Sequence, residues 1–242
     1  MVRSIRAAVS FLTVLPVANA DGGAGTRLGR AYFPAIGALV GLVAGSVLVL
    51  VEAISTPLLG AAAAVATLCL LTGAIHLDGL ADSADGIFGR GDAARRLEVM
   101  RDPRLGSYGV TAVVAALLLQ TAALAAMAPG RALVALVMAG AMSRLAAALV
   151  IAWLPYVRST GLGTAASTSS GRGIDLAAGL ATVLLVALLD WRRALVALAL
   201  VAVAVVLVAG LARRRLGGVT GDVCGASAEL SQLAVLLVFA TR

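Results

Sequence analysis

Three aspartates, Asp78, Asp82 and Asp85, are spaced four and three residues apart within a stretch that runs from Thr72 to Arg90. On an α-helix this spacing places all three carboxylates on one face. Two carboxylates about 4 Å apart repel by roughly 4 kcal/mol at an effective dielectric near 20, so stability alone does not call for the arrangement. Mg²⁺ held by carboxylates and a substrate phosphate would relieve the repulsion. The structural alternative is a solvated acidic helix end between two membrane spans.

The same stretch contains the only histidine of the chain, His76, two residues before Asp78. It is a candidate general base, and a histidine satisfied at the membrane edge is an equal alternative. Glycines in the stretch lower helix propensity, and we expect them to let a ligand approach the backbone. These glycines are Gly73, Gly79, Gly86 and Gly89.

Arginines in three other places could contact phosphate. Arg101 and Arg104 could together clamp phosphate oxygens, and we expect Pro103 to break the helix there and the nearby glycines Gly106 and Gly109 to loosen the chain after it. Arg144 lies within an apolar run, where burial costs at least about 2.5 kcal/mol, so it should face the bundle interior and pair with an acid or a phosphate. Arg158 begins a loop rich in Gly, Ser and Thr, a composition that suits phosphate binding or a flexible linker equally.

A second acidic motif lies near the C-terminal end of the sequence. Asp222 and Glu229 are seven residues apart and share a face if a helix begins at Gly221. Asp222 could also be a plain helix cap. Glu229 lies inside an apolar run, where an isolated carboxylate is costly, so it is a candidate functional residue.

Composition places these residues in a membrane protein. Of 242 residues, 61% are apolar and 13% charged, and the mean hydropathy is +1.04. We expect an all-α, polytopic helical bundle that forms one membrane-embedded domain over residues 1–242. The net charge of +7 is explained by arginines at an anionic membrane surface rather than by nucleic-acid binding. About seven spans are predicted, at 32–51, 57–77, 108–127, 132–153, 174–189, 194–212 and 226–240.

The N-terminal segment resembles a secretory signal, with Arg3 and Arg6 before a short apolar run. Pro16 interrupts that run, so we expect a retained amphipathic or half-inserted segment. The first span carries Gly37, Gly41 and Gly45, a spacing that allows close helix packing. Most arginines fall in the loops on one side of the membrane, which predicts a cytoplasmic N-terminus and places the polar loops at 78–107, 155–173 and 213–225 on the cytoplasmic face.

Taken together, the motifs resemble those of bacterial cobalamin synthase, the adenosylcobinamide-GDP ribazoletransferase family. The most specific is the run His-Leu-Asp-Gly-Leu-Ala-Asp-Ser-Ala-Asp-Gly at 76–86, and the resemblance covers nearly the whole chain. The sequence departs from the family pattern at Ala74, where a glycine is usual, and at Pro103, where a small residue is common. The matching motifs lie at 12–16, 33–37, 72–86, 98–109, 161–163 and 221–229.

The resemblance implies a Mg²⁺ enzyme of the bacterial inner membrane, with a cytoplasmic active face, that joins α-ribazole or its 5′-phosphate to adenosylcobinamide-GDP and releases GMP. On this basis Asp78, Asp82 and Asp85 are expected metal ligands, and one of them or His76 the proton acceptor. The expected catalytic residues are Asp82, His76 and Glu229. Six residues are expected to bind substrate or to complete the site: Arg101, Arg104, Arg144, Arg158, Asp222 and Glu229. Whether the protein forms a homo-oligomer stays open.

Two rival functions remain open from the sequence. The run Asp82-x-x-Asp85-Gly86-x-x-Gly89-Arg90 is similar to the start of the CDP-alcohol phosphotransferase motif, but the later aspartates of that motif are missing. A cation transporter with a carboxylate gate predicts acids near the middle of spans and an inverted repeat. No such repeat is visible, and the acids gather toward one face.

Overall fold

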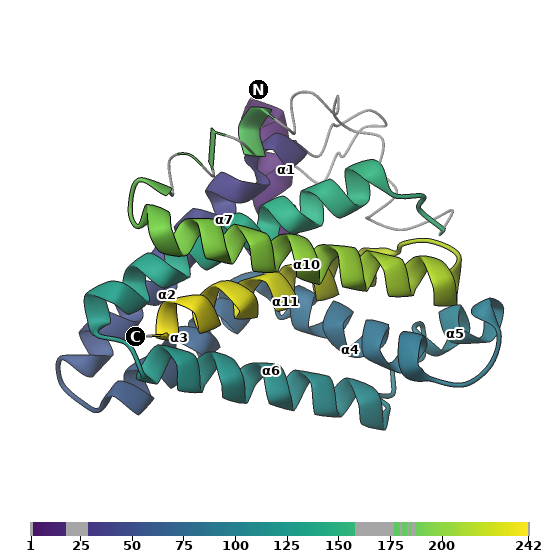
Figure 1. The fold of residues 1–242 in the computed structure, drawn as a ribbon, viewed down its shortest axis with the longest axis horizontal. Helices are drawn as coiled ribbons and strands as arrows, with labels where there is room; N and C mark the ends of the chain where they lie inside the picture. Colours follow the sequence, from purple (N-terminus) through teal and green to yellow (C-terminus); the bar gives the residue numbers. More distant parts are fainter. Residues whose placement is uncertain are drawn as a thin grey trace.

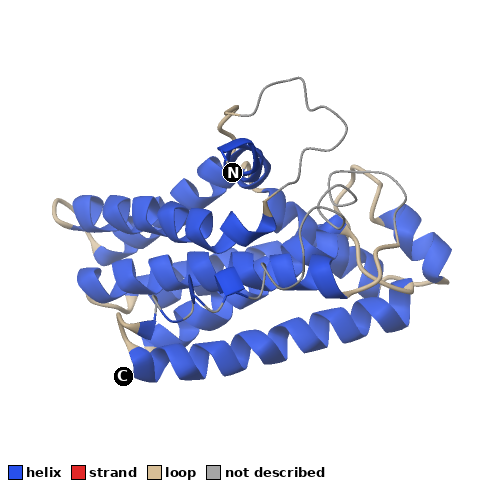
Figure 2. Ribbon diagram, turned by 90° about the horizontal axis from the view of Figure 1, so that it is seen from above, coloured by secondary structure: helices blue, strands red, loops and turns tan. Residues whose placement is uncertain are grey.

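The structure, a computed structural model, describes residues 2–17, 29–157, 177–179, 181–182, 184 and 187–241. Within these residues the chain is helical throughout, apart from loops and an isolated parallel β-bridge between Tyr156 and Val219 (Figure 2). The predicted all-α class is therefore confirmed. The helices are α1 (Val2–Leu12), the 3-10 helix η1 (Arg30–Tyr32), α2 (Phe33–Glu52), α3 (Pro57–Thr72), α4 (Ile75–Phe88), α5 (Ala93–Val99), α6 (Ser107–Ala125), α7 (Pro129–Trp153), α10 (Trp191–Leu216) and α11 (Gly221–Ala240).

Among the described residues, five helices are long and apolar enough to cross a membrane: α2 together with η1, α6, α7, α10 and α11. The bent pair α3 and α4 makes a sixth crossing if it counts as one span. The five helices match five of the predicted spans, and α10 and α11 begin earlier than expected. The predicted span at 174–189 falls mostly outside the described residues, so a count of seven stays a prediction.

The second predicted span, 57–77, is wrong as a single helix. α3 ends at Thr72, and α4 starts at Ile75 after a bend of 88°. Gly73 and Ala74 both adopt left-handed backbone angles, with φ of 60° and 55°. The Ala74 amide donates to the Cys69 carbonyl at 2.9 Å, which closes the end of α3. The acidic stretch therefore forms a separate helix instead of continuing the span.

α7 lies at the centre of the bundle and contacts α2, α10 and α11. The glycines of α2 pack against it: a Cβ on Gly37 would collide with the Gly140 carbonyl, and one on Gly41 with the Leu136 carbonyl. The predicted close-packing face of α2 is thus confirmed, and its partner is a glycine on α7. Small residues at a helix contact let the two backbones approach closely.

α1 is the amphipathic segment that the sequence predicts. Its 11 residues rise about 16 Å, too little to cross a hydrocarbon core of about 30 Å. The Phe11 ring stacks on Phe33 of α2 with centroids 5.5 Å apart. The Val14 amide then donates to the Leu71 carbonyl at 2.9 Å. These contacts hold the N-terminal segment beside the bend between α3 and α4.

The acidic helix α4 lies alongside α6 and α11, and α5 follows it at the end of the bundle (Figure 1). The crossing of α4 and α11 is close, because a Cβ on Gly79 would meet the backbone of Asp222 at 2.7 Å. Gly225 of α11 is equally near, since its Cβ would lie 3.3 Å from the Cα of both Gly79 and His76. The two acidic motifs, far apart in sequence, therefore meet at this crossing.

We predict that Gly140→Ala destabilises the protein by about 1–3 kcal/mol or more, because the added methyl must push the α2 and α7 backbones apart. Gly130→Ala is the matched control on the same helix, since nothing lies within 4 Å of its Cβ position. Thermal unfolding in detergent micelles measures both variants. Equal melting temperatures for the two would contradict the close contact.

Candidate active site on α4

All three aspartates of the acidic motif lie on α4, at the helical spacing that puts them on one face. Their exposure falls along the helix: Asp78 is exposed, Asp82 is half-buried and Asp85 is buried. Asp78 therefore offers its carboxylate to a ligand most openly. Asp85 is covered by neighbouring elements, and its environment differs from that of the other two.

Asp85 binds the N-terminus of α6. One carboxylate oxygen accepts from the Gly106 amide at 2.8 Å, and the other accepts from the Gly109 amide at 2.9 Å. These amides belong to the first turn, which has no helical partners and carries partial positive charge. A Cβ on Gly106 or Gly109 would collide with the Asp85 carboxylate. The two glycines thus admit a buried carboxylate, whereas the sequence led us to expect that they loosen the chain.

Glycines in and beside α4 have packing or backbone roles, while their predicted role in ligand access stays a prediction. Gly79 faces Asp222 and Gly225 of α11, and a Cβ on Gly86 would collide with Met100. Gly73 supplies the left-handed turn before the helix. Close helix contact is a common role for glycine in a membrane helix, but the partners of these glycines lie elsewhere in the sequence.

Arg96 closes the other end of α4. Its guanidinium donates to the carbonyls of Gly86 at 3.0 Å, Ile87 at 2.6 Å and Gly91 at 2.9 Å. A cation is favourable at a helix C-terminus, where carbonyls lack helical partners. The sequence alone did not distinguish Arg96 from ordinary loop arginines, and only its place in a basic cluster after the motif could have pointed to it.

Asp222 lies at the start of α11, beside α4. The Thr220 hydroxyl accepts from the Val223 amide at 3.3 Å and caps the helix, and it donates to Asp222 at 3.3 Å. The Gly221 amide donates to the Tyr156 hydroxyl at 3.2 Å. Thr220 is therefore the capping residue, and the backbone of the half-buried Asp222 lies against Gly79 of α4.

Glu229, also on α11, belongs to a buried polar chain inside the bundle. Gln120 of α6 donates to Glu229 at 3.0 Å and accepts from Gln232 at 3.0 Å. Gln232 in turn accepts from Arg144 of α7 at 2.8 Å. Arg144 faces the interior as predicted, but its nearest hydrogen-bond partners are neutral, Gln232 and Ser143. Sequence reasoning missed both glutamines, whose only signal was a polar side chain within an apolar run.

His76 is buried against Gly225 and lines a cavity of about 50 Å³ together with residues of α1, α2, α7 and α11. Asp78 lines a different cavity. The structure thus does not bring His76 and Asp78 to the same space.

The basic loop after α5 is exposed. Arg104 donates through Nε and Nη2 to both carboxylate oxygens of Asp102, at 2.9 and 2.7 Å. These hydrogen bonds lower the pKa of Asp102 to about 2. Arg101 is exposed as well, and Arg158 lies outside the described residues. The Nη1 donors of Arg104 point to neither oxygen of Asp102 in these hydrogen bonds, so the guanidinium keeps donors for a phosphate.

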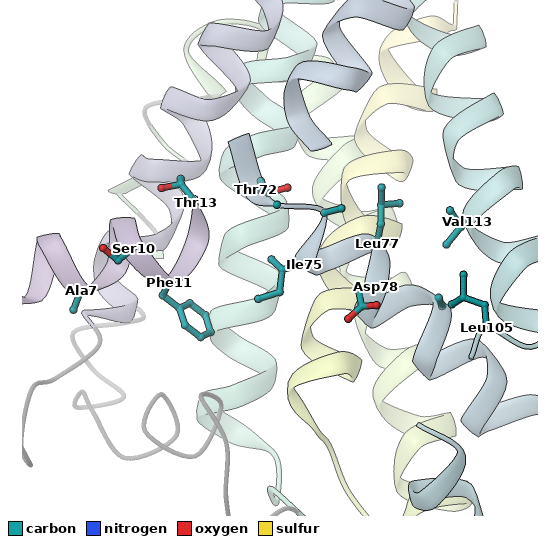
Figure 3. A pocket seen from close by; sticks show the side chains of 13 residues that line it. Ala7, Ser10, Phe11, Thr13, Thr72, Ile75, Leu77, Asp78, Leu105 and Val113 are labelled. Carbon is teal, nitrogen blue, oxygen red and sulfur yellow. The ribbon is translucent and has the colours of Figure 1, made fainter. Parts of the chain in front are cut away.

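The cavity beside Asp78 encloses about 750 Å³ between α1, the α3–α4 bend, α4 and the start of α6. Figure 3 shows Phe11 and Ile75 toward α1, Leu105 and Val113 toward α6, and Asp78 between them. An exposed carboxylate thus adjoins a largely apolar space.

Within the described part of the chain, no three side chains of His, Cys, Asp or Glu are grouped as a metal site. Asp78 and Asp82 are one turn apart, and Asp85 has amide partners on both oxygens. Mg²⁺ is commonly held by one or two carboxylates, several waters and substrate phosphates. The acids of α4 suit a cation site that substrate completes, and do not form an all-protein cage.

Comparison with known proteins identifies the family of the chain. The family described as Cobalamin-5-phosphate synthase matches residues 4–240. Relatives from Bradyrhizobium diazoefficiens, Stutzerimonas stutzeri and Escherichia coli are 38%, 41% and 37% identical, and each is named adenosylcobinamide-GDP ribazoletransferase. The matches cover 99%, 97% and 96% of this chain and 94%, 96% and 96% of the relatives. No solved structure matches the chain significantly. The chain belongs to the cobalamin-5-phosphate synthase family.

Proposed function

We propose that the protein transfers α-ribazole, or its 5′-phosphate, onto adenosylcobinamide-GDP and releases GMP. The observation that carries the proposal is the row of aspartates on α4, open at Asp78 and anchored at Asp85, in a chain whose relatives bear the name of this transferase. Phosphoryl transfer from a diphosphate depends mainly on alignment and charge neutralisation. An acidic helix face beside a cavity suits both requirements.

In the proposed reaction, a ribose hydroxyl of α-ribazole attacks the phosphorus nearest the corrinoid. A new P–O bond forms as the P–O bond to the bridging oxygen breaks, and that oxygen leaves on GMP with the electron pair. The hydroxyl proton passes to a base. Asp82 is the proposed acceptor, since it is half-buried and one turn from Asp78, whereas His76 lines a separate cavity.

Mg²⁺ is the proposed cofactor, with Asp78 and Asp82 as its ligands and Asp85 as the third acid of the set. Bound there, the ion would neutralise the diphosphate. The two hydrogen bonds that Asp85 accepts support a fixing role for it, because they hold its carboxylate against α6. Carboxylate oxygens are ligands that Mg²⁺ prefers.

Some of the other candidate residues would contact substrate, and others would act on the site indirectly. Asp222, beside Gly79, would orient substrate at the acidic face. Arg101 and Arg104, both exposed, would steady the GMP leaving group, as would Arg158. Glu229 and Arg144 would act through the buried glutamine chain that joins α6, α7 and α11, and so would position the site.

The two rival functions are not favoured. A CDP-alcohol phosphotransferase would share the logic of a metal-bound diphosphate, but the chain belongs to a different family. A transporter is disfavoured on the same ground. We further propose that the protein lies in the bacterial inner membrane with the acidic end of α4 toward the cytoplasm. The arginines at the end of α10 and after α4 support this orientation.

The first expected outcome concerns the reaction itself. Purified protein in lipid vesicles, given adenosylcobinamide-GDP and α-ribazole, should release GMP and form the joined corrinoid in equal amounts, and chelation of Mg²⁺ should stop both. Chromatography of both products is the measurement. GMP release without joined corrinoid would contradict the transfer, and CMP release from a CDP-alcohol would support the rival enzyme.

The second concerns Asp82. We expect Asp82→Asn to lower the transfer rate about 100-fold or more, because the substitution removes a charge and a proton acceptor but keeps the shape. Asp92→Asn is the control: Asp92 caps α5 by accepting from the Arg95 amide at 2.9 Å, and Asn caps equally well. Asp82→Asn activity within about tenfold of the wild type would refute this role.

A further inference from the structure

The cavity beside Asp78 has a size that selects among the proposed substrates. Its volume is about 750 Å³, within the range of about 300–1,000 Å³ that holds drug-sized ligands. The two other cavities near the site enclose about 10 and 50 Å³. A nucleoside is of drug size, whereas a corrinoid that carries GDP is several times larger. This open cavity has room for the nucleoside but not for the whole corrinoid.

The walls are apolar and come from separate elements. Phe11 comes from α1, Ile75 from the start of α4 and Val113 from α6. Three hydroxyls also line the space, but each donates to a backbone carbonyl of its own segment: Ser10 to Leu15, Thr13 to Val9 and Thr72 to Leu68. Their donors are already used, so the space favours a flat apolar ring.

Charge separates the nucleoside from the guanine nucleotide. Among the described residues that line the cavity, Asp78 is the one charged side chain, and no lining residue is cationic. A diphosphate placed deep among the apolar walls, away from the cation proposed at Asp78, would lack the arginine partners that anions usually find. A neutral base with a ribose meets no such penalty, and a carboxylate accepts hydrogen bonds from ribose hydroxyls.

We propose that this cavity binds the acceptor nucleoside, with the benzimidazole ring of α-ribazole between the α1 and α6 walls and the ribose directed toward Asp78. The inference rests on the proposed transferase function. It makes the amphipathic helix α1 a wall of the substrate site. The stacking of Phe11 on Phe33 and the hydrogen bond from Val14 to Leu71 hold that wall in place.

Two adjacent valines on α6 give a matched test. Val113 lines the cavity, whereas Val114 is 49% exposed and is not among the lining residues. Val113→Phe should raise the KM for α-ribazole roughly tenfold or more, because a filled apolar pocket discriminates by factors of this size. The KM for adenosylcobinamide-GDP should stay near the wild-type value, and Val114→Phe should change neither. In Val113→Phe, the KM should rise less for a smaller nucleoside whose benzimidazole ring is unsubstituted than it does for α-ribazole.

Ala7→Leu narrows the same cavity from α1 and is the second variant should Val113→Phe fail to fold. The binding of α-ribazole without corrinoid is measured by its benzimidazole fluorescence. The four proteins compared are the wild type, Val113→Phe, Ala7→Leu and Val114→Phe. Weaker binding in Val113→Phe and Ala7→Leu but not in Val114→Phe supports the site, even if no transfer occurs and the proposed function falls.

Three results would overturn the inference. One is unchanged nucleoside binding in both cavity variants. Another is a raised KM for the corrinoid alone, which would assign the cavity to that substrate. The third is an equal loss in Val114→Phe, which would mean that bulk on α6 disturbs the fold in general.

Discussion

The carboxylate of Asp85 accepts hydrogen bonds from two amides at the N-terminus of α6, and this interaction fixes the acidic helix α4 against its neighbour. The contact requires glycine at both amide positions, because a Cβ on Gly106 or Gly109 would occupy the place of the carboxylate. It also satisfies two amides that have no partners within the helix at the start of α6. Once α4 is held there, the positions of Asp78 and Asp82 follow from helical geometry.

α4 begins after the bend at Gly73 and Ala74. At its other end, the guanidinium of Arg96 donates to the last carbonyls of the helix. α11 packs along it through Gly79 and brings Asp222 to the same place. The helix that carries the acids is thus held on several sides, and its first acid, Asp78, lines a cavity whose other walls include residues of α1 and α6. A preorganised acidic face suits a reaction in which most of the catalytic work is charge neutralisation and alignment.

The sequence predicted those features of the structure that depend on residues close together in the chain. Apolar runs located the five helices that are long enough to cross a membrane. The i, i+4, i+7 spacing placed Asp78, Asp82 and Asp85 on one helix, and the burial cost of Arg144 predicted its inward orientation. The bend was missed because Ala74 adopts a left-handed angle that alanine rarely takes. The partners of Asp85 and Glu229 were missed because they lie 21 to 109 residues away, and single-sequence periodicity carries no information about such contacts.

The most direct test of the proposed metal site on α4 is the binding of Mn²⁺. This ion accepts the same oxygen ligands as Mg²⁺ and is paramagnetic. Electron paramagnetic resonance on the purified protein with adenosylcobinamide-GDP should detect bound Mn²⁺ coupled to phosphorus. Asp78→Asn and Asp82→Asn should lose most of that signal, whereas Asp92→Asn keeps it. Equal binding of Mn²⁺ in Asp82→Asn and the wild type would contradict the assignment of α4 as the helix that holds the diphosphate.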